Sequence, residues 1–232
     1  MSRTQIIRTE PRISLNALTE YLHVNASRRR KIIEEQKRPN DFQVIYYQYA
    51  QDAIAKFIAD GMSDEEILQQ EIDRLFHKTP ANDYDKYRLS SNVKAIQSFL
   101  SFYSKLNTHG LSAQLAPDSQ PKMMYGGIRI SVRPEVILIG NMPRYENPIG
   151  AVKLLFNKQK KNFLTAKSAV YPAALVYDFL RKIHHTKAAV HKVTYVIDVF
   201  AKEIYSAPKA TARLMADVDI SCQEIAMWWP TI

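Results

Sequence analysis

Three consecutive strand patterns between residues 125 and 158 most strongly constrain how this chain can fold. The first, over 128–133, alternates apolar with polar side chains, which is the two-residue period of a half-buried strand. The second, Val136–Ile139, is continuously apolar, as in a strand that is buried on both faces. The third, Ala151–Phe156, is also apolar, except that it contains Lys153. The stretch therefore predicts a largely buried sheet that holds one lysine.

A lysine among apolar neighbours is costly unless its ammonium group finds an anion. Glu135 directly follows Pro134, at the start of the second strand pattern, and is the acidic candidate on an adjacent predicted strand. We therefore predict that Glu135 and Lys153 meet on adjacent strands. Two plainer interpretations stay open: Glu135 can be solvated in a hairpin turn, and Lys153 can bury its stem and extend its charge to a strand edge.

The remaining patterns place helices around this sheet. Residues 14–106 read almost entirely as helix, and residues 107–122 read as a flexible connection because they contain glycine and prolines. From Tyr84 onward the order is helix, three strands, helix, strand, helix, and the first two strands are predicted to form a tight hairpin. The later elements are a helix from Ala166 to His184, a strand from Val190 to Phe200, and a last helix that opens at Ala207-Pro208 and runs to Trp228.

This order predicts an α/β (α+β) fold in two parts. Residues 1–80 form a helical N-terminal region, and residues 81–232 form a domain with a mixed four-stranded sheet flanked by helices, in the order αβββαβα.

Over residues 84–228 the chain resembles the PD-(D/E)XK nucleases, the superfamily with the restriction-endonuclease-like fold. The resemblance depends on the helix–strand–strand–strand–helix–strand order, on Pro134-Glu135 at the second strand, and on Lys153 in the third. It implies a nuclease that acts on DNA or RNA with Mg²⁺, as in mobile-element, repair or phage-defence systems. Glu135 would then ligate the metal, and Lys153 would position the attacking water or stabilise charge on the phosphate.

The chain departs from the family pattern at one position. The family places an acid two residues before the lysine, where this chain has Ala151. Since Mg²⁺ needs hard oxygen ligands, a second carboxylate would have to come from elsewhere. Glu146 before the third strand, Asp178 on the following helix and Asp198 in the fourth strand are the candidates. If none of them reaches the site, the fold would bind nucleic acid without cutting it.

The charge of the chain also favours a polyanionic partner. The formal net charge is +9, and the Lys and Arg residues are clustered, whereas acidic residues gather between Asp64 and Asp73. A solubilising surface that binds nothing is the alternative. The candidate nucleic-acid-binding residues are Arg28, Arg29, Arg30, Lys31, Lys158, Lys160, Lys161 and Lys167.

Other function classes find little support in the composition. The chain has no apolar run long enough to cross a bilayer and no secretory pattern at its start, so we expect a cytoplasmic protein without a membrane partner. A single cysteine, Cys222, makes a structural zinc site improbable. Three functions therefore remain: a Mg²⁺-dependent nuclease, a non-catalytic nucleic-acid-binding or assembly subunit of a nucleic-acid-processing complex, and a helical adaptor that binds proteins.

Overall fold

Two mixed sheets form the framework of the protein in a computed structural model, which describes residues 7–39, 46–158 and 164–232. The larger sheet has the strand order β2-β5-β6-β7-β8, and the smaller has the order β1-β4-β3. In the larger sheet β6 and β7 are parallel and every other neighbouring pair is antiparallel. The strands are β1 (Arg12–Ser14), β2 (Ser112–Leu115), β3 (Met123–Tyr125), β4 (Ile128–Ser131), β5 (Val136–Ile139), β6 (Pro148–Leu155), β7 (Ala188–Asp198) and β8 (Glu203–Ser206).

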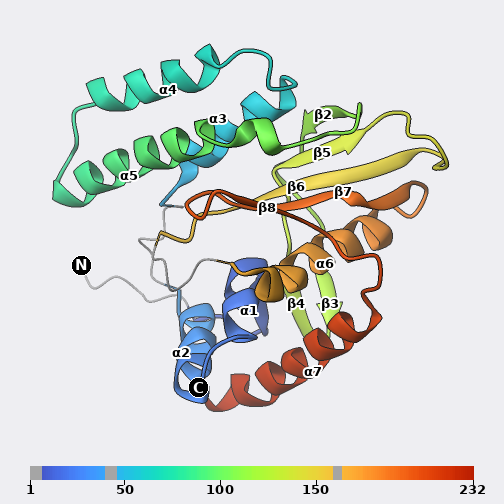
Figure 1. Cartoon of the computed structure of the whole chain (residues 1–232). Helices are drawn as coiled ribbons and strands as arrows, with labels where there is room; N and C mark the ends of the chain where they lie inside the picture. The colour runs from blue at the N-terminus through green and yellow to red at the C-terminus, as the bar shows by residue number, and fades with distance from the viewer. Residues whose placement is uncertain (1–6, 40–45, 159–163) are drawn as a thin grey trace.

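Helices cover both faces of the larger sheet, as Figure 1 shows. Three of them, α3 to α5, lie on one face, while α6 packs on the other, with the smaller sheet, α1, α2 and α7 beyond it. The helices are α1 (Leu15–Tyr21), α2 (Ala26–Lys37), α3 (Gln48–Ala59), α4 (Glu66–His77), α5 (Asp83–Leu100), α6 (Ala166–Ile183) and α7 (Ala212–Trp228), with short 3-10 turns at Tyr103–Lys105 and Trp229–Thr231.

The larger sheet separates two apolar cores because its side chains alternate between faces. In β6, Val152 and Leu154 join the core under α3–α5, while Ala151 and Leu155 join the core around α6. All eight residues of β6 are buried, and Lys153 lies among them on the α6 side. The predicted mixed α/β class and the predicted strand patterns are therefore confirmed.

The predicted arrangement of the strands is wrong in two respects. First, β4 and β5 do not form a hairpin, since β4 pairs with β1 and β3 while β5 pairs with β2 and β6. Arg133 has a φ of 47° between them, and the chain changes sheet at this point. Second, the sheet has five strands rather than four. Part of the predicted connection is β2, and β8 precedes the last helix, which begins at Ala212 rather than at Ala207.

The N-terminal residues contribute to the same sheets and cores as the rest of the chain. β1 pairs in parallel with β4, and α1 packs against α6. The predicted boundary near residue 80 falls between α4 and α5, which pack against each other. Within the predicted helical region the sequence favours a helix from Phe42 to Ala59, and the first residues of that prediction lie outside the described residues. In the part of the chain that the structure describes, the helices lack the length and apolar character needed to cross a bilayer.

Gly150 marks the closest backbone approach in the larger sheet. A Cβ atom built at this position would lie 2.2 Å from the carbonyl oxygen of Val193 on β7, where the β6–β7 register shifts. Because that oxygen belongs to backbone in a central strand, it cannot rotate away as a side chain would.

We therefore expect Gly150→Ala to destabilise the protein by about 1–3 kcal/mol, as overpacking in a core does. Chemical denaturation measures the loss, and Gly110→Ala is a control for conformation alone. Gly110 has a positive φ, of 79°, which Gly150 does not share, and no atom lies within 4 Å of its added Cβ. Gly110→Ala therefore reports the strain of a left-handed backbone without a clash, whereas a loss below about 1 kcal/mol in Gly150→Ala would show that the contact with Val193 does not matter.

Candidate nucleic-acid interface

Glu135 and Lys153 form a buried ion pair between β5 and β6. The backbone N–H of Glu135 donates to Val152 O (2.9 Å), which extends the β5–β6 ladder by one residue and puts the two side chains next to each other. The Lys153 ammonium donates to Glu135 Oε1, and the backbone N–H of Leu154 donates to Oε2 at 2.6 Å. The two side chains are 9% and 6% exposed, so the predicted convergence of acid and lysine is what the structure shows.

Burial dominates the electrostatics of this pair. Desolvation raises the pKa of Glu135 above its ordinary value, although the Lys153 ammonium and the hydrogen bonds oppose the shift. A buried carboxylate and ammonium of this kind depend on each other, because either one alone would be an uncompensated charge.

The acids proposed to complete a metal site lie elsewhere. Glu146 is exposed in the β5–β6 loop, at the opposite end of β6 from Glu135. Lys153 follows Glu146 by seven residues. At a rise of about 3.3 Å per residue, the two residues therefore lie roughly 20 Å apart. Asp178 on α6 instead accepts from Tyr125 Oη and pairs with Lys182 at 3.1 Å.

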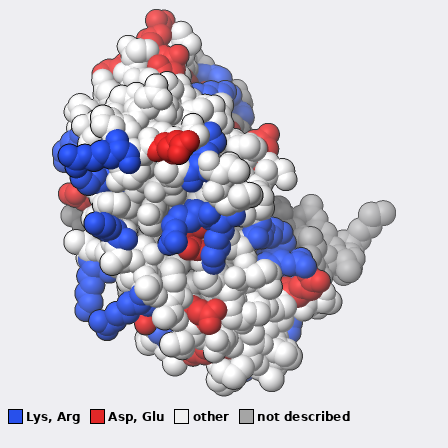
Figure 2. Space-filling model, turned by 90° about the vertical axis from the view of Figure 1, so that its right-hand side faces the viewer, with Lys and Arg blue, Asp and Glu red and all other residues white. Residues whose placement is uncertain are grey.

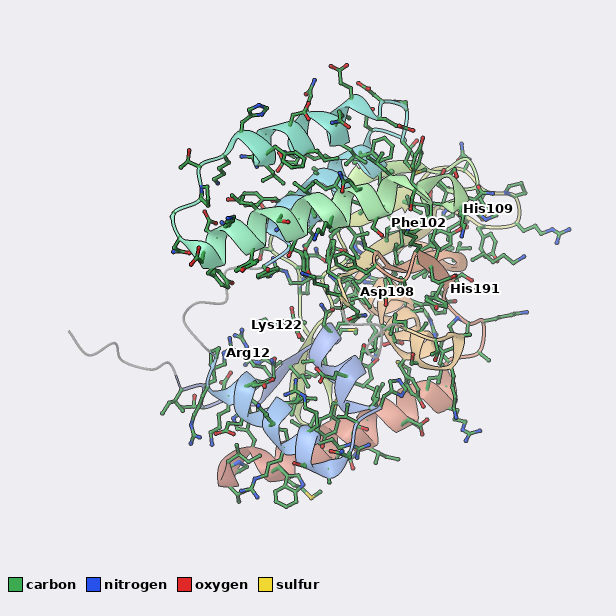
Figure 3. The ribbon with its side chains drawn as sticks, turned by 60° about the vertical axis from the view of Figure 1, so that its left-hand side comes forward. Arg12, Phe102, His109, Lys122, His191 and Asp198 are labelled. Atoms are coloured by element: carbon green, nitrogen blue, oxygen red, sulfur yellow. The ribbon has the colours of Figure 1, made fainter. Side chains whose placement is uncertain are left out.

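Asp198 lies at the end of β7 and organises the surrounding loops. Its carboxylate accepts from the Asn157 amide (3.0 Å), from the backbone N–H of Leu164 (2.9 Å) and from that of Ala201 (3.3 Å). Burial raises the pKa of Asp198, and these hydrogen bonds oppose the rise. Figure 3 shows Asp198 in the body of the molecule, away from Arg12 and Lys122 on the smaller sheet.

These positions do not fit a Mg²⁺ ion held by the protein at Glu135. Both oxygens of that carboxylate already accept hydrogen bonds from protein groups. Nowhere in residues 7–39, 46–158 and 164–232 do three acidic, histidine or cysteine side chains gather as metal ligands. We therefore derive no chemistry through a metal.

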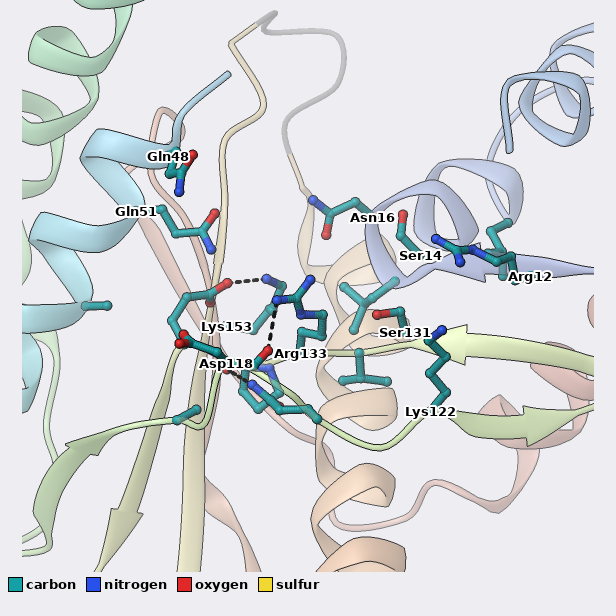
Figure 4. Close-up of a pocket in the computed structure, with 18 of the residues that line it drawn as sticks. Arg12, Ser14, Asn16, Gln48, Gln51, Asp118, Lys122, Ser131, Arg133 and Lys153 are labelled. Carbon is teal, nitrogen blue, oxygen red and sulfur yellow. Dashed lines mark hydrogen bonds and ion pairs between the residues drawn. The ribbon is translucent and has the colours of Figure 1, made fainter. Parts of the chain in front are cut away.

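The ion pair lies in the lining of a cleft of about 920 Å³. One wall comes from β1, β4 and the start of α1, and the opposite wall comes from α3 and the segment after β2 (Figure 4). Gln48 and Gln51 on α3 lie across the cleft from Ser14 and Arg12. Basic residues predominate in the lining: Arg8, Arg12, Lys56, Lys122, Arg129, Arg133 and Lys153 face four acids, Glu35, Asp52, Asp118 and Glu135.

Four of these seven cations lie on or beside one face of the smaller sheet. Arg12 on β1 is paired in register with Arg129 on β4, and Arg133, two residues after the end of β4, also lines the cleft. Lys122, just before β3, lies beside Ser131 (Figure 4). The apolar partners of the alternation, such as Ile130, point into the core. The sheet thus presents a row of cations and hydroxyl groups to the cleft.

The cations of this wall are only partly neutralised. Arg129 pairs with Glu10 at the surface, and Arg133 donates to the backbone oxygen of Asp118 at 3.1 Å. Burial, together with the charge of nearby Arg12, lowers the pKa of Arg8. Two like charges held close together in a cleft favour an anion between or beside them.

The predicted basic residues of α2 are partly occupied by intramolecular contacts. Arg28 pairs with Glu20 at 2.7 Å and with Glu35 at 2.8 Å, and Arg29 pairs with Glu224 at 3.3 Å. Arg30 and Lys31 are exposed but do not line the cleft.

The second predicted basic group lies around the end of β6 and the start of α6. Lys158 donates to Ser91 Oγ on α5 at 3.1 Å, and Lys167 is exposed in the first turn of α6. Lys160 and Lys161 lie outside the described residues.

Positively charged side chains also lie on the surface outside the cleft. On the face in Figure 2, Lys and Arg gather across the middle, while Asp and Glu mark its upper end.

Sequence reasoning missed all four cations of this wall, Arg12, Lys122, Arg129 and Arg133. The alternation in 128–133 was visible, but β1 is only three residues long and pairs with a strand more than 100 residues away. Lys122 fell within the predicted connection. No local pattern brings these four residues to one surface.

The comparisons with known proteins leave the family open. No protein-family model matches the chain, and the search of curated proteins gives no match. The geometry of the cleft and the arrangement of the strands are therefore what indicate a function.

Proposed function

We propose that this protein binds nucleic acid by its sugar-phosphate backbone, in the cleft between the smaller sheet and α3. The row formed by Arg12, Arg129, Arg133 and Lys122 carries the proposal. Cations and hydroxyl groups spaced along a sheet match the repeating phosphate oxygens of a strand, and such contacts position a backbone without reading its sequence.

The order of elements supports the same proposal. The sequence α5, β2, β5, β6, α6, β7 gives helix–strand–strand–strand–helix–strand, with β3 and β4 as an excursion into the smaller sheet. Glu135 then precedes the second strand of the series, and Lys153 lies in the third. This is the arrangement that the resemblance to PD-(D/E)XK nucleases implies, so we propose a restriction-endonuclease-like architecture.

In this proposal Glu135 and Lys153 serve as the floor of the cleft rather than as a metal site. Their charges neutralise each other, while Arg12, Lys122 and Arg133 on the wall have no ion pair with another described residue. The protein then holds a nucleic acid for a partner subunit instead of cutting it. A Mg²⁺-dependent nuclease is the second candidate, which the order of elements favours; it would require Glu135 to exchange its hydrogen bonds from Lys153 and Leu154 for a metal ion.

Titrating labelled DNA and RNA with the protein at several salt concentrations tests binding. If the four wall cations contact phosphates, the logarithm of the association constant should fall linearly with the logarithm of salt concentration, with a slope of about −3 to −4. No binding, or binding that does not change with salt, would contradict the proposal, and salt-insensitive association with a protein partner would favour the adaptor.

Incubating the same substrates with Mg²⁺, Mn²⁺ or a chelator separates the two candidates. We expect no metal-dependent cleavage of single-stranded or double-stranded substrates. Cleavage that disappears in both Glu135→Gln and Lys153→Met, while their circular dichroism stays native, would instead establish the nuclease.

A further inference from the structure

An exposed tyrosine lines the cleft, and a second lies one helical turn further along the same helix. Tyr84, at the start of α5, lines the cleft and is 53% exposed. Tyr87, one turn further along the same helix, is 69% exposed. An aromatic ring with a free face beside a row of cations is the combination that proteins use to hold unpaired nucleic-acid strands.

The ring of Tyr84 is held in place from behind. It contacts Tyr46 edge-on, with the ring centroids 5.8 Å apart, and Tyr46 contacts Tyr47 in the same way at 5.0 Å. Tyr47 in turn stacks on Phe156, which follows β6, at 5.0 Å and an interplanar angle of 13°. This chain of rings connects Tyr84 to the sheet, so little side-chain freedom remains to be lost on binding.

A cation also lies next to α5, beyond the two exposed tyrosines. Ser91 lies one turn beyond Tyr87 on α5, and its hydroxyl contacts both Tyr46 Oη (3.2 Å) and Lys158 Nζ (3.1 Å). The Lys158 ammonium is therefore anchored on the flank of α5, beside the tyrosines. A backbone that leaves the cleft along α5 would meet this cation after passing the two rings.

We propose that the cleft takes a single-stranded nucleic acid, with an unpaired base stacked on Tyr84 and the next on Tyr87. The inference rests on the proposed function, since the wall cations must hold the backbone for the bases to reach the rings. In a duplex the faces of the bases are already stacked on one another, so they offer nothing to an exposed tyrosine. Every base has a flat face, so the contact tolerates any sequence.

The test combines strands with and without bases and proteins with and without the Tyr84 ring. Labelled strands of about 16 nucleotides are compared as a normal single strand, as an abasic strand of the same length and as a duplex, in DNA and in RNA. We expect the normal strand to bind more tightly than the other two. Tyr84→Ala should weaken binding of the normal strand by roughly 5- to 100-fold, as the loss of one stacked base does, and leave the abasic strand unchanged.

Two variants control for the ring itself. Tyr84→Phe keeps the ring and should bind like the wild type. Phe76→Ala removes an equally exposed ring (67% exposed) on α4 that does not line the cleft, and should have no effect.

The result also separates this inference from the proposed function. Equal losses on normal and abasic strands in Tyr84→Ala, or a duplex bound as tightly as a single strand, would overturn the stacking inference alone. If even the abasic strand shows no salt-dependent binding, the proposed function fails as well.

Discussion

Replacing Arg12, Arg129 and Arg133 together with glutamine is expected to weaken nucleic-acid binding by about 100-fold at roughly 0.15 M salt. Each phosphate contact that is lost removes close to one released counterion, so three contacts lower the salt slope by about 2 to 3. Glutamine keeps much of the side-chain length of arginine and a hydrogen-bond donor, so the main difference is the loss of the positive charge. The loss of the Arg129–Glu10 pair matters little for stability, because that pair is at the surface.

A matched variant distinguishes the cleft from the general charge of the protein. Arg30, Lys31 and Lys167 are exposed, do not line the cleft, and were predicted from the sequence as nucleic-acid contacts. Changing these three to glutamine lowers the net charge by the same amount as the cleft variant. We expect that control to retain nearly the full salt slope. Fluorescence anisotropy with the same labelled strand measures both variants.

The opposite outcome is equally informative. If the control variant loses the larger part of the slope, the basic surface of α2 and the start of α6 binds the backbone, and the cleft does not. Equal, small losses in both would mean that binding depends on net charge alone, as for a basic surface without a defined site.

The strands that could be predicted are those whose own side chains specify them. Val136–Ile139 is apolar throughout because each of its faces meets a different core, and its neighbours in sequence do not alter that requirement. β1, β2 and β8 are three or four residues long and are partly exposed, so their pairing depends on strands elsewhere in the chain. The hairpin prediction failed because the change of sheet at Arg133 depends on β1, which lies far upstream.

The candidate site shows the same division. Lys153 could be recognised because an ammonium group within an apolar strand requires a partner, and Glu135 was the acid in reach. The wall of the cleft could not be recognised, since Arg12 and Arg129 become neighbours only through a parallel pairing of distant segments. The conspicuous run at Arg28 was misleading in part, because such a run does not reveal that Glu20 and Glu35 lie beside it.

The second large effect concerns stability. Lys153→Met is expected to lower the free energy of unfolding by about 3–5 kcal/mol at pH 8, because it leaves the Glu135 carboxylate buried without a counter-charge. Glu135→Gln together with Lys153→Met should recover most of the loss. A buried ion pair can be replaced by neutral groups at little cost, and the glutamine oxygen can still accept from the Leu154 N–H.

The stability of the Lys153→Met variant should change with pH in a defined direction. Burial already raises the pKa of Glu135 in the folded protein, and the loss of Lys153 should raise it further. Above the unfolded pKa of about 4.3, the folded state then binds more protons than the unfolded state, so stability falls as the pH rises. Lys153→Met should therefore be less harmful near pH 5 than near pH 8, because a raised pKa favours the neutral carboxyl group of Glu135 as the pH falls. The double variant should lack this trend.

Urea denaturation of the wild type, the single variants and the double variant across this pH range measures the coupling between the two residues. Arg129→Gln, which breaks the exposed pair with Glu10, is the control and should cost less than about 1 kcal/mol at every pH. A small, pH-independent loss for Lys153→Met would mean that the buried Glu135 does not depend on a counter-charge from Lys153. Its ammonium would then be available to a bound phosphate, which would strengthen the case for the nuclease over the binding subunit.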